Sequence, residues 1–156
     1  MSELKLPKLR KSDPDRIKKK KILLLCDDLR MHSGIATQSK EFVMGTMHKY
    51  DWVQIAGAVK HPDNGKVIDM SQAVASEYGV ADGYLKLYPT TGYGNPDMLR
   101  EIIRIEKPDA ILHFTDPRFW TWLYQMEHEL RQDIPILYYN IWDDIPDPLY
   151  NTHFYR

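Results

Sequence analysis

A repeated alternation between short apolar runs and longer segments of helical periodicity is the feature that most constrains what this chain can fold into. The apolar runs, each of which we expect to form a β-strand, occupy residues 21–26, 51–59, 84–88, 109–114 and 134–141. The first run is continuously apolar, as a strand is when helices cover both faces of a parallel sheet. The alternation therefore predicts an α/β fold with a mostly parallel sheet.

Segments of helical period separate these runs, at residues 35–50, 96–106 and 117–131. Asn95 and Asp116 are expected to cap the second and third helices, because each is followed by proline at the first helical position. Residues 67–78 fit either a short helix or a meander. The full order predicts a Rossmann-like, three-layer α/β/α domain with about five or more strands.

The length of 156 residues suits one domain of ordinary size. A formal net charge of -1 argues against a generally basic nucleic-acid binder, but the charge is unevenly spread. Residues 1–21 carry nine basic and three acidic side chains (+6), and the rest of the chain carries 12 basic and 19 acidic side chains (-7). We expect residues 1–20 to be a disordered basic leader and residues 21–156 to form the domain. The leader is a solvated edge, a nuclear address or a weak contact to an anionic surface.

Cys26 is the only cysteine and lies inside the first apolar run, which predicts a buried thiol and a reducing, cytoplasmic location. No apolar stretch approaches the roughly 18–20 residues that a membrane-spanning helix needs, so we expect no transmembrane segment. The basic leader also lacks the apolar core of a secretory signal.

Three segments should converge at the carboxyl edge of the sheet, where open parallel sheets bind ligands: residues 27–34, 115–118 and 142–147. In the first segment, Gly34 stands at a helix start, where backbone N–H groups and the helix dipole favour a phosphate or carboxylate. Alternatively, Gly34 only permits a tight turn between strand and helix. In the second segment, Asp116 is expected to be a helix cap first and a ligand second.

The third segment carries Asp143, Asp144 and Asp147, which either act as a base and hold sugar hydroxyls or form a solvated acidic loop. Trp142, at the expected strand end, is a candidate aromatic wall against a sugar ring. The aromatic residues of the preceding helix are expected to serve packing instead: Phe119, Trp120, Trp122 and Tyr124.

Several common catalytic patterns are absent from the sequence. It contains no Gly-x-Gly-x-x-Gly, no Gly-Lys-Ser or Gly-Lys-Thr, no Gly-x-Ser-x-Gly and no His or Cys spacing typical of a metal site. We therefore expect no metal and no self-contained hydrolase. His113, inside an expected strand, is interpreted as a core histidine rather than a base.

Four motifs follow one another in the chain: Lys21-Ile-Leu-Leu-Leu, His32-Ser-Gly-Ile-Ala, Glu106-Lys-Pro-Asp-Ala-Ile-Leu-His and Ile134-Pro-Ile-Leu-Tyr-Tyr-Asn-Ile-Trp-Asp143. Their order and spacing resemble the N-terminal domain of a GT-B glycosyltransferase of the retaining family 4 (glycosyl transferase group 1) type, over residues 21–150. The resemblance implies one half of a GT-B architecture, in which two Rossmann-like domains face each other across a cleft. In that family the N-terminal domain receives the acceptor and the C-terminal domain holds the nucleotide-sugar donor.

The resemblance also implies roles for individual residues. Gly34 matches the glycine whose backbone approaches the donor phosphates, with His32 and Ser33 beside it. Thr115 and Asp116 match a loop that lines the cleft. No cofactor or metal is implied, because helix ends and basic side chains neutralise the diphosphate leaving group.

Two departures from the family pattern change these expectations. Many members end the fifth strand in His-Asp, whereas Trp142-Asp143 stand here, so the catalytic role falls to Asp143, with Trp142 as a stacking surface and Asp144 as a substrate ligand. The paired glutamates and basic phosphate-binding residues of a donor domain have no counterpart in the sequence. We therefore expect the chain alone to be inactive and to need a C-terminal donor domain or a partner chain. In the first case the reading frame should continue beyond residue 156.

The alternative is a flavodoxin-like or receiver-like α/β module that binds a partner or small ligand without catalysis. Asp27 and Asp28, after the first strand, resemble the acidic pair of a receiver domain. A receiver would also carry an aspartate after the third strand and a lysine after the fifth, and neither stands there. A third possibility is that the basic leader contacts a nucleic acid or an anionic membrane that holds the acceptor.

Overall fold

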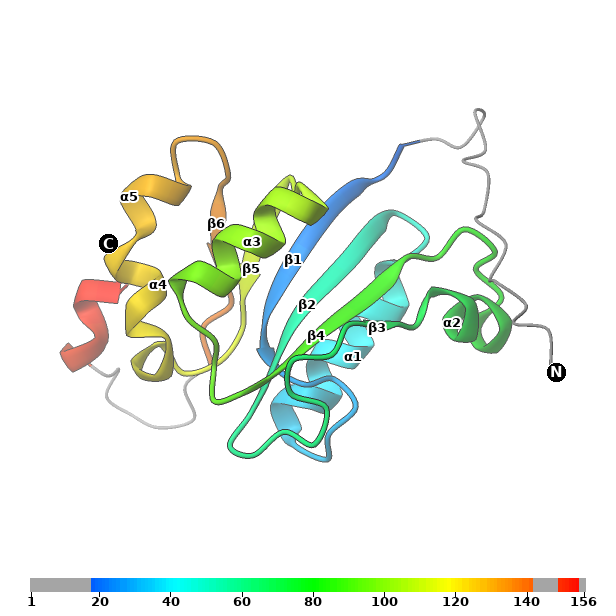
Figure 1. The fold of residues 1–156 in the computed structure, drawn as a ribbon, viewed down its shortest axis with the longest axis horizontal. Coiled ribbons are helices and arrows are strands. Elements are labelled where there is room, and N and C mark those ends of the chain that lie inside the picture. Colours follow the sequence, from blue (N-terminus) through cyan, green and yellow to red (C-terminus); the bar gives the residue numbers. More distant parts are fainter. Residues whose placement is uncertain (1–17, 142–148, 155–156) are drawn as a thin grey trace, which may run out of the picture.

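Residues 18–141 and 149–154 are described by the structure, a computed structural model of the chain (Figure 1). The strands are β1 (Lys20–Asp27), β2 (Tyr50–Ala58), β3 (Ile68–Asp69), β4 (Leu85–Thr91), β5 (Ala110–His113) and β6 (Ile136–Tyr138). The α-helices are α1 (Gly34–Thr46), α2 (Ser71–Tyr78), α3 (Pro96–Glu106), α4 (Thr121–Gln125) and α5 (Glu127–Leu130). Two 3-10 helices, η1 (Pro117–Trp120) and η2 (Leu149–Phe154), complete the described elements.

Within the described ranges, six strands form one sheet in the order β3-β4-β2-β1-β5-β6. Neighbouring strands pair in parallel, except that β3 runs antiparallel to β4. Without β3, the parallel strands lie in the order third, second, first, fourth, fifth, which is how the Rossmann order begins. The sequence-based prediction of an α/β fold with a mostly parallel sheet is confirmed.

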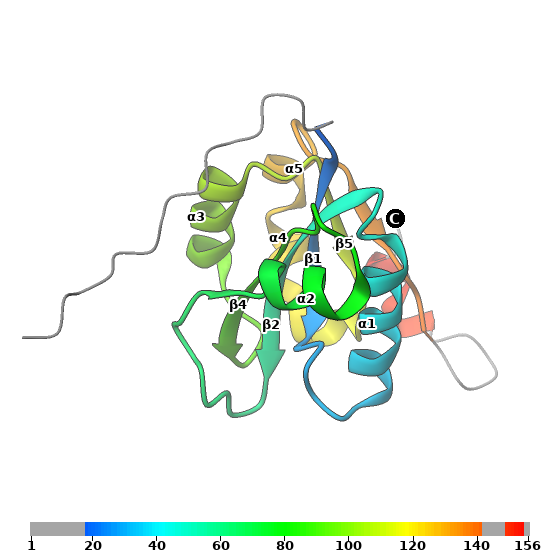
Figure 2. The ribbon, with the colours of Figure 1, turned by 90° about the vertical axis from the view of Figure 1, so that its right-hand side faces the viewer.

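Helices cover both faces of the sheet, with α1 and α3 on opposite sides (Figure 2). The side chains of β1 alternate between two clusters: Leu23 and Leu25 pack with α3 and α4, while Leu24 and Cys26 pack with α1 and α2. All four are buried, and burial of each leucine stabilises the fold by roughly 1.5–3 kcal/mol. Burial raises the pKa of the Cys26 thiol to about 12, so the buried thiol predicted from the sequence is confirmed.

The middle of the chain contains both a short strand and a short helix, β3 and α2. Strand β4 runs on to Thr91, beyond the expected end at residue 88, even though it includes Pro89. The Pro89 carbonyl accepts a hydrogen bond from Gly65 N–H at 3.1 Å on the side away from β2, so the ladder between β4 and β2 needs no N–H from this proline.

The last third of the chain is less regular than its pattern predicts. The continuous helix expected over residues 117–131 is replaced by η1, α4 and α5, because the backbone leaves helical geometry at Trp120 (φ -122°, ψ 30°) and Met126 (φ -105°, ψ 11°). Both side chains are buried, so core packing overrides helical continuity there. The strand expected over residues 134–141 covers only Ile136–Tyr138.

A buried carboxylate joins α3 to the amino end of the strands. Glu106, the last residue of α3, accepts hydrogen bonds from Tyr84 Oη at 2.8 Å, Tyr88 Oη at 2.6 Å and Lys21 Nζ at 3.0 Å. Burial by itself raises the pKa of Glu106, but the hydrogen bonds from Tyr88, Lys21 and Tyr84 outweigh it and hold the pKa at about 2. Burial and the Glu106 charge also raise the pKa of both tyrosines.

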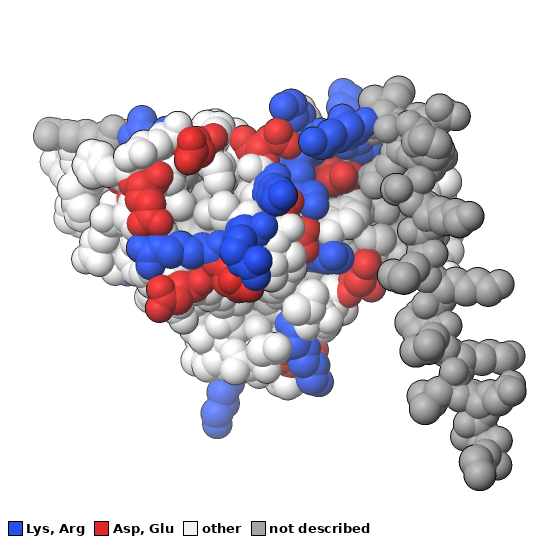
Figure 3. Space-filling view, turned by 45° about the horizontal axis from the view of Figure 1, so that its top comes forward, with Lys and Arg blue, Asp and Glu red and all other residues white. Residues whose placement is uncertain are grey.

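Cationic and anionic side chains are interspersed on the surface around this end of the sheet (Figure 3). Ion pairs here and along α3 include Lys20 with Asp109, Arg100 with Glu129, and Arg104 with Glu101. The face in view therefore carries no extended patch of one sign. None of the helices in the described ranges combines the length and apolar character needed to span a bilayer.

We predict that Glu106→Gln lowers the free energy of unfolding at pH 7 by about 2–4 kcal/mol, because the amide removes the buried counter-charge of Lys21. The pKa of Glu106 is lowered from 4.5 to about 2, so its stabilising effect is complete above pH 4.5 and is lost as the pH falls towards 2. The variant should lose less stability over that range. Urea denaturation of both proteins at neutral and acidic pH measures the difference.

Glu101→Gln is the matched control, since Glu101 is exposed on the same helix and pairs with Arg104. Because an exposed ion pair contributes little to stability, this variant should unfold almost like the wild type and lose nearly as much stability as the wild type when the pH falls. Equal effects of the two substitutions would contradict the role assigned to the Glu106 network.

Candidate functional site

The carboxyl ends of β1 and β5 lie side by side where the strand order reverses. The N–H of Phe114, just after β5, donates to the Leu25 carbonyl at 3.0 Å, so the two strands stay paired to their ends. The chain then leaves β1 towards α1 on one face of the sheet and leaves β5 towards η1 on the other. An open parallel sheet binds its ligands at such a point.

Ser33 positions the start of α1. Its hydroxyl accepts the Ala36 N–H at 3.0 Å as the N-cap and donates to Asp27 Oδ2 at 3.3 Å. The first turn of α1 has no acidic side chain, so the positive end of the helix dipole is not neutralised by the helix itself. Ser33 and Gly34 therefore stand at a helix start as expected, with His32 exposed beside them.

Gly34 is not required by the fold. Its φ lies outside the left-handed region, unlike those of Gly65, Gly79, Gly92 and Gly94. A Cβ added at Gly34 would meet no heavy atom within 4 Å. Neither backbone conformation nor packing therefore requires a glycine at this position, because an alanine would fit there without strain.

Asp27 ends β1 in a half-buried position beside Ser33. Burial raises the pKa of Asp27, and the hydrogen bond from Ser33 opposes this only in part. Burial, followed by the charges of Asp27 and Asp116, raises the pKa of Tyr93, so these three side chains share one electrostatic environment. A carboxyl group with a raised pKa at a strand end is a candidate for holding or moving a proton. The acidic pair after β1 is visible in the sequence, but the burial of Asp27 is not.

The loop after β5 contains Thr115 and Asp116. Asp116 Oδ1 accepts the Arg118 N–H at 2.9 Å, which confirms the predicted cap, and its carboxylate also pairs with the Arg118 guanidinium. The hydrogen bonds from Arg118 lower the pKa of Asp116. Thr115 is only 6% exposed, and its carbonyl accepts the Tyr138 hydroxyl at 3.3 Å. At this edge Asp116 is thus the more accessible of the two.

His113, at the end of β5, is buried as predicted. Its Nδ1 lies 2.7 Å from Tyr124 Oη, and its ring stacks on Tyr138 with 5.2 Å between centroids. Burial lowers the pKa of His113 to about 3, so the imidazole is neutral at physiological pH. His113 is therefore unsuited to act as a base near pH 7.

An aromatic surface adjoins the same edge. Phe119 is 56% exposed and stacks on Tyr93 with 5.3 Å between ring centroids. The expectation that Phe119 serves packing holds only for its contact with Tyr93, because more than half of Phe119 is exposed, whereas Trp120 is buried as expected. A flat exposed ring of this kind can pack against a sugar ring or another apolar face.

The third expected segment lies outside the described residues. This applies to Asp143, Asp144, Asp147 and Trp142. Among residues 18–141 and 149–154, no group of three or more His, Cys, Asp or Glu side chains is placed to hold a metal ion.

Asp28 has different surroundings from its neighbour Asp27. Its carboxylate is 1% exposed, and Oδ2 lies 2.7 Å from both Arg30 Nη2 and His61 Nε2. The Asp63 N–H donates to His61 Nδ1 at 3.0 Å, which assigns the imidazole proton to Nε2. Burial raises the pKa of Asp28, but the hydrogen bonds from Arg30 and His61 lower it below its usual value. Because His61 lies 33 positions away, the sequence pattern does not reveal this contact.

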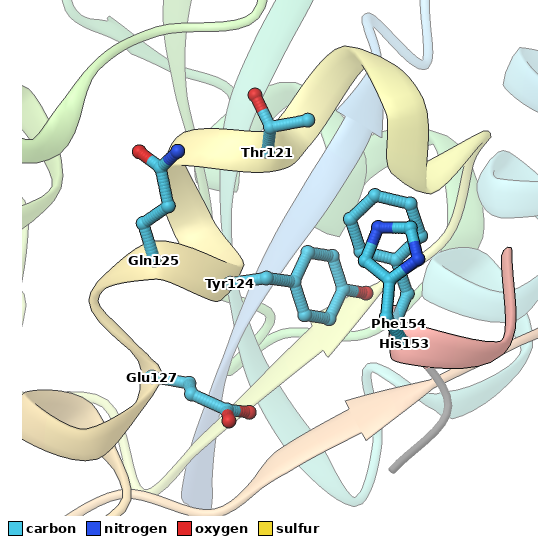
Figure 4. Close-up of a pocket in the computed structure, with 6 residues that line it drawn as sticks. All are labelled: Thr121, Tyr124, Gln125, Glu127, His153 and Phe154. Carbon is cyan, nitrogen blue, oxygen red and sulfur yellow. The ribbon is translucent and has the colours of Figure 1, made fainter.

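Two cavities accompany these groups. One, of about 230 Å³, lies between η2 and the helices after η1 and is lined by Thr121, Tyr124, Gln125, Glu127, His153 and Phe154 (Figure 4). Tyr124 points from α4 towards Phe154, and its hydroxyl links this cavity to His113. The other cavity, of about 520 Å³, lies between the loops after β1 and β2, beside Asp28.

We predict different effects on stability for substitutions of the two adjacent aspartates. Asp27→Asn should leave the unfolding temperature at pH 7 unchanged or raised by roughly 1–3 °C, because a charged Asp27 with a raised pKa opposes folding above that pKa. Asp28→Asn should lower the free energy of unfolding by about 2–4 kcal/mol, because it breaks a buried charge pair. Thermal unfolding followed by circular dichroism compares them, and equal losses would contradict the assigned environments.

The chain matches no protein-family model, no curated protein and no solved structure. Its function must therefore be inferred from the geometry of the carboxyl edge and from the order of the sequence motifs.

Proposed function

We propose that this chain is the acceptor-side, N-terminal domain of a retaining GT-B glycosyltransferase of the family 4 type. It would move a sugar from an NDP-sugar to an acceptor, and it needs a donor-binding domain or partner chain for turnover. The observation that supports this most is Gly34, a glycine at the reversal of strand order that neither backbone conformation nor packing requires. Close approach of a ligand to the backbone is a physical reason for a glycine there.

A diphosphate suits the start of α1. The first N–H groups of a helix lack partners within the helix, and Ser33 occupies that of Ala36, so those of Gly34 and Ile35 are directed out of the helix end. The dipole of α1 adds positive potential, and its first turn has no acidic side chain, although the Asp27 carboxylate lies 3.3 Å from the hydroxyl of the N-cap Ser33. We assign the donor diphosphate to this position, with His32 and Ser33 beside it.

The opposite side of the cleft is assigned to the loop after β5 and to the residues that follow β6. From β5 we assign Asp116 to its lining, together with Thr115, which is almost fully buried. Asp143 is proposed to act in catalysis, Trp142 to stack on a sugar ring, and Asp144 to hold a sugar hydroxyl. The exposed aromatic surface of η1 directly follows the loop after β5.

The chemistry divides between this chain and the second domain. Transfer requires the leaving diphosphate to be stabilised, which the amino end of α1 provides by its dipole and N–H groups. It also requires water to be excluded, which the second domain provides by closing over the cleft. We assign to Asp27, whose pKa burial raises, the sharing of a proton with a sugar or acceptor hydroxyl. No metal takes part in this scheme.

A non-catalytic flavodoxin-like or receiver-like module is the second candidate, favoured by the acidic pair after β1. Those folds place the first strand between the second and third, whereas β1 here lies between β2 and β5. Titration with Mg²⁺ separates the two candidates. A receiver-like site binds the ion through Asp27 and Asp28, while the glycosyltransferase proposal expects no binding because Arg30 and His61 occupy Asp28.

The second domain would hold most of the donor, but the start of α1 should bind the diphosphate weakly by itself. We predict that Gly34→Ala weakens this binding at least about tenfold, because its methyl group stands where the diphosphate approaches the backbone. The variant should be as stable as the wild type, or more stable by up to about 1 kcal/mol. Titration of the ¹⁵N-labelled chain with UDP-, GDP- and ADP-sugars, followed at the Gly34 and Ile35 amide signals, measures the binding.

Gly45→Ala is the matched control. Gly45 also lies in α1, has no left-handed φ and would tolerate a Cβ without any contact within 4 Å. It should gain stability in the same way and bind donors like the wild type. The proposal fails if no donor shifts the Gly34 amide, or if both variants bind equally well.

A further inference from the structure

The cavity between the loops after β1 and β2 has the volume of a small-molecule site, about 520 Å³. We call it the Arg30 pocket. Its apolar walls are Met31, Ala58 and Pro62, and its polar lining includes Arg30, His32 and Lys60. This cavity shares His32 with the proposed donor site, but its other lining residues lie on the β2 side of the end of β1.

The floor of the Arg30 pocket offers no free acceptor. Asp28 and His61 are both at least nine-tenths buried there. Both oxygens of the Asp28 carboxylate accept hydrogen bonds from Arg30, and Oδ2 also accepts from His61. A ligand in the pocket can therefore bind Arg30, but it finds no free carboxylate oxygen on Asp28.

Arg30 keeps donors available while its side chain is fixed. Its Nε and Nη2 bind Asp28, and its Nη1 lies 3.4 Å from Asp63 Oδ2. A guanidinium has five N–H groups, so two remain free for a ligand. Because Asp28 already orients the guanidinium, a ligand that binds it loses little side-chain entropy.

Lys60 and His32 add further donors at the rim of the pocket. Within residues 18–141 and 149–154, no hydrogen bond or ion pair joins either side chain to another residue. The remaining carboxylate of the lining, Asp63, is already paired with Lys66 at 2.9 Å and with Arg30. The pocket thus presents unused hydrogen-bond donors around an apolar wall.

We propose that the Arg30 pocket binds an organic phosphate ester. Its phosphate oxygens would accept from Arg30, Lys60 and His32, and its apolar part would lie against Met31 and the neighbouring wall. A phosphate matches three donor side chains better than a carboxylate does, because it offers three terminal oxygens instead of two. This inference does not rest on the proposed glycosyltransferase function.

Phenyl phosphate, benzoate and phenol test the inference, since they share one ring and differ in head group. Met31 lies in the pocket wall, so its methyl signal in the chain labelled with [methyl-¹³C]methionine reports binding, with Met31→Leu identifying the signal. Phenyl phosphate should shift the signal saturably, and benzoate should bind at least about threefold more weakly. Phenol should not saturate.

Lys60→Gln should raise the dissociation constant of phenyl phosphate roughly five- to tenfold, because one charge-assisted hydrogen bond is lost. Lys40→Gln, an exposed lysine of α1 outside the pocket, is the control and should change it less than about twofold. Any of three results overturns the inference: no shift at about 20 mM phenyl phosphate, binding of phenol or benzoate as tight as that of phenyl phosphate, or equal effects of the two lysine variants.

Discussion

Strand β1 is hydrogen-bonded along both edges and packed on both faces, and this double confinement sets the positions of the groups that follow it. Because side chains alternate along a strand, Asp27 continues the face of Leu25 and emerges towards Tyr93. The next residue, Asp28, donates its N–H to the end of β2 and turns its carboxylate to His61. The side chains of these two adjacent aspartates therefore lie in different environments.

The parts of the fold that could be predicted from the sequence are those that local pattern decides. Continuous apolar runs become the central strands because such runs can be stable only between two layers of helices. The caps at Asn95 and Asp116 form because each side chain accepts a backbone N–H within its own turn. The breaks at Trp120 and Met126 could not be predicted, because the burial of those side chains depends on distant parts of the chain.

The candidate site was predictable to a smaller extent. Its position, at the carboxyl edge, follows from the fold class, and Ser33 and Gly34 follow from the strand-to-helix turn. No sequence pattern predicts the roles of Arg30 and His61, because both depend on their contacts with the Asp28 carboxylate, which the fold buries between them. Glu106 is similar, since its partners are separated from it by 18 to 85 positions. The local sequence pattern thus predicts which edge of the sheet carries the site, whereas tertiary contacts determine which charged side chains are buried and paired there.

The burial of Cys26 makes site-specific labelling of this chain straightforward. A thiol with a pKa of about 12 in the core has almost no thiolate at neutral pH, so alkylating reagents should leave it unmodified. Since the sequence contains no other cysteine, one introduced at an exposed position would be the only reactive thiol. Fluorophores or spin labels can then be attached at chosen loops without first altering the native core.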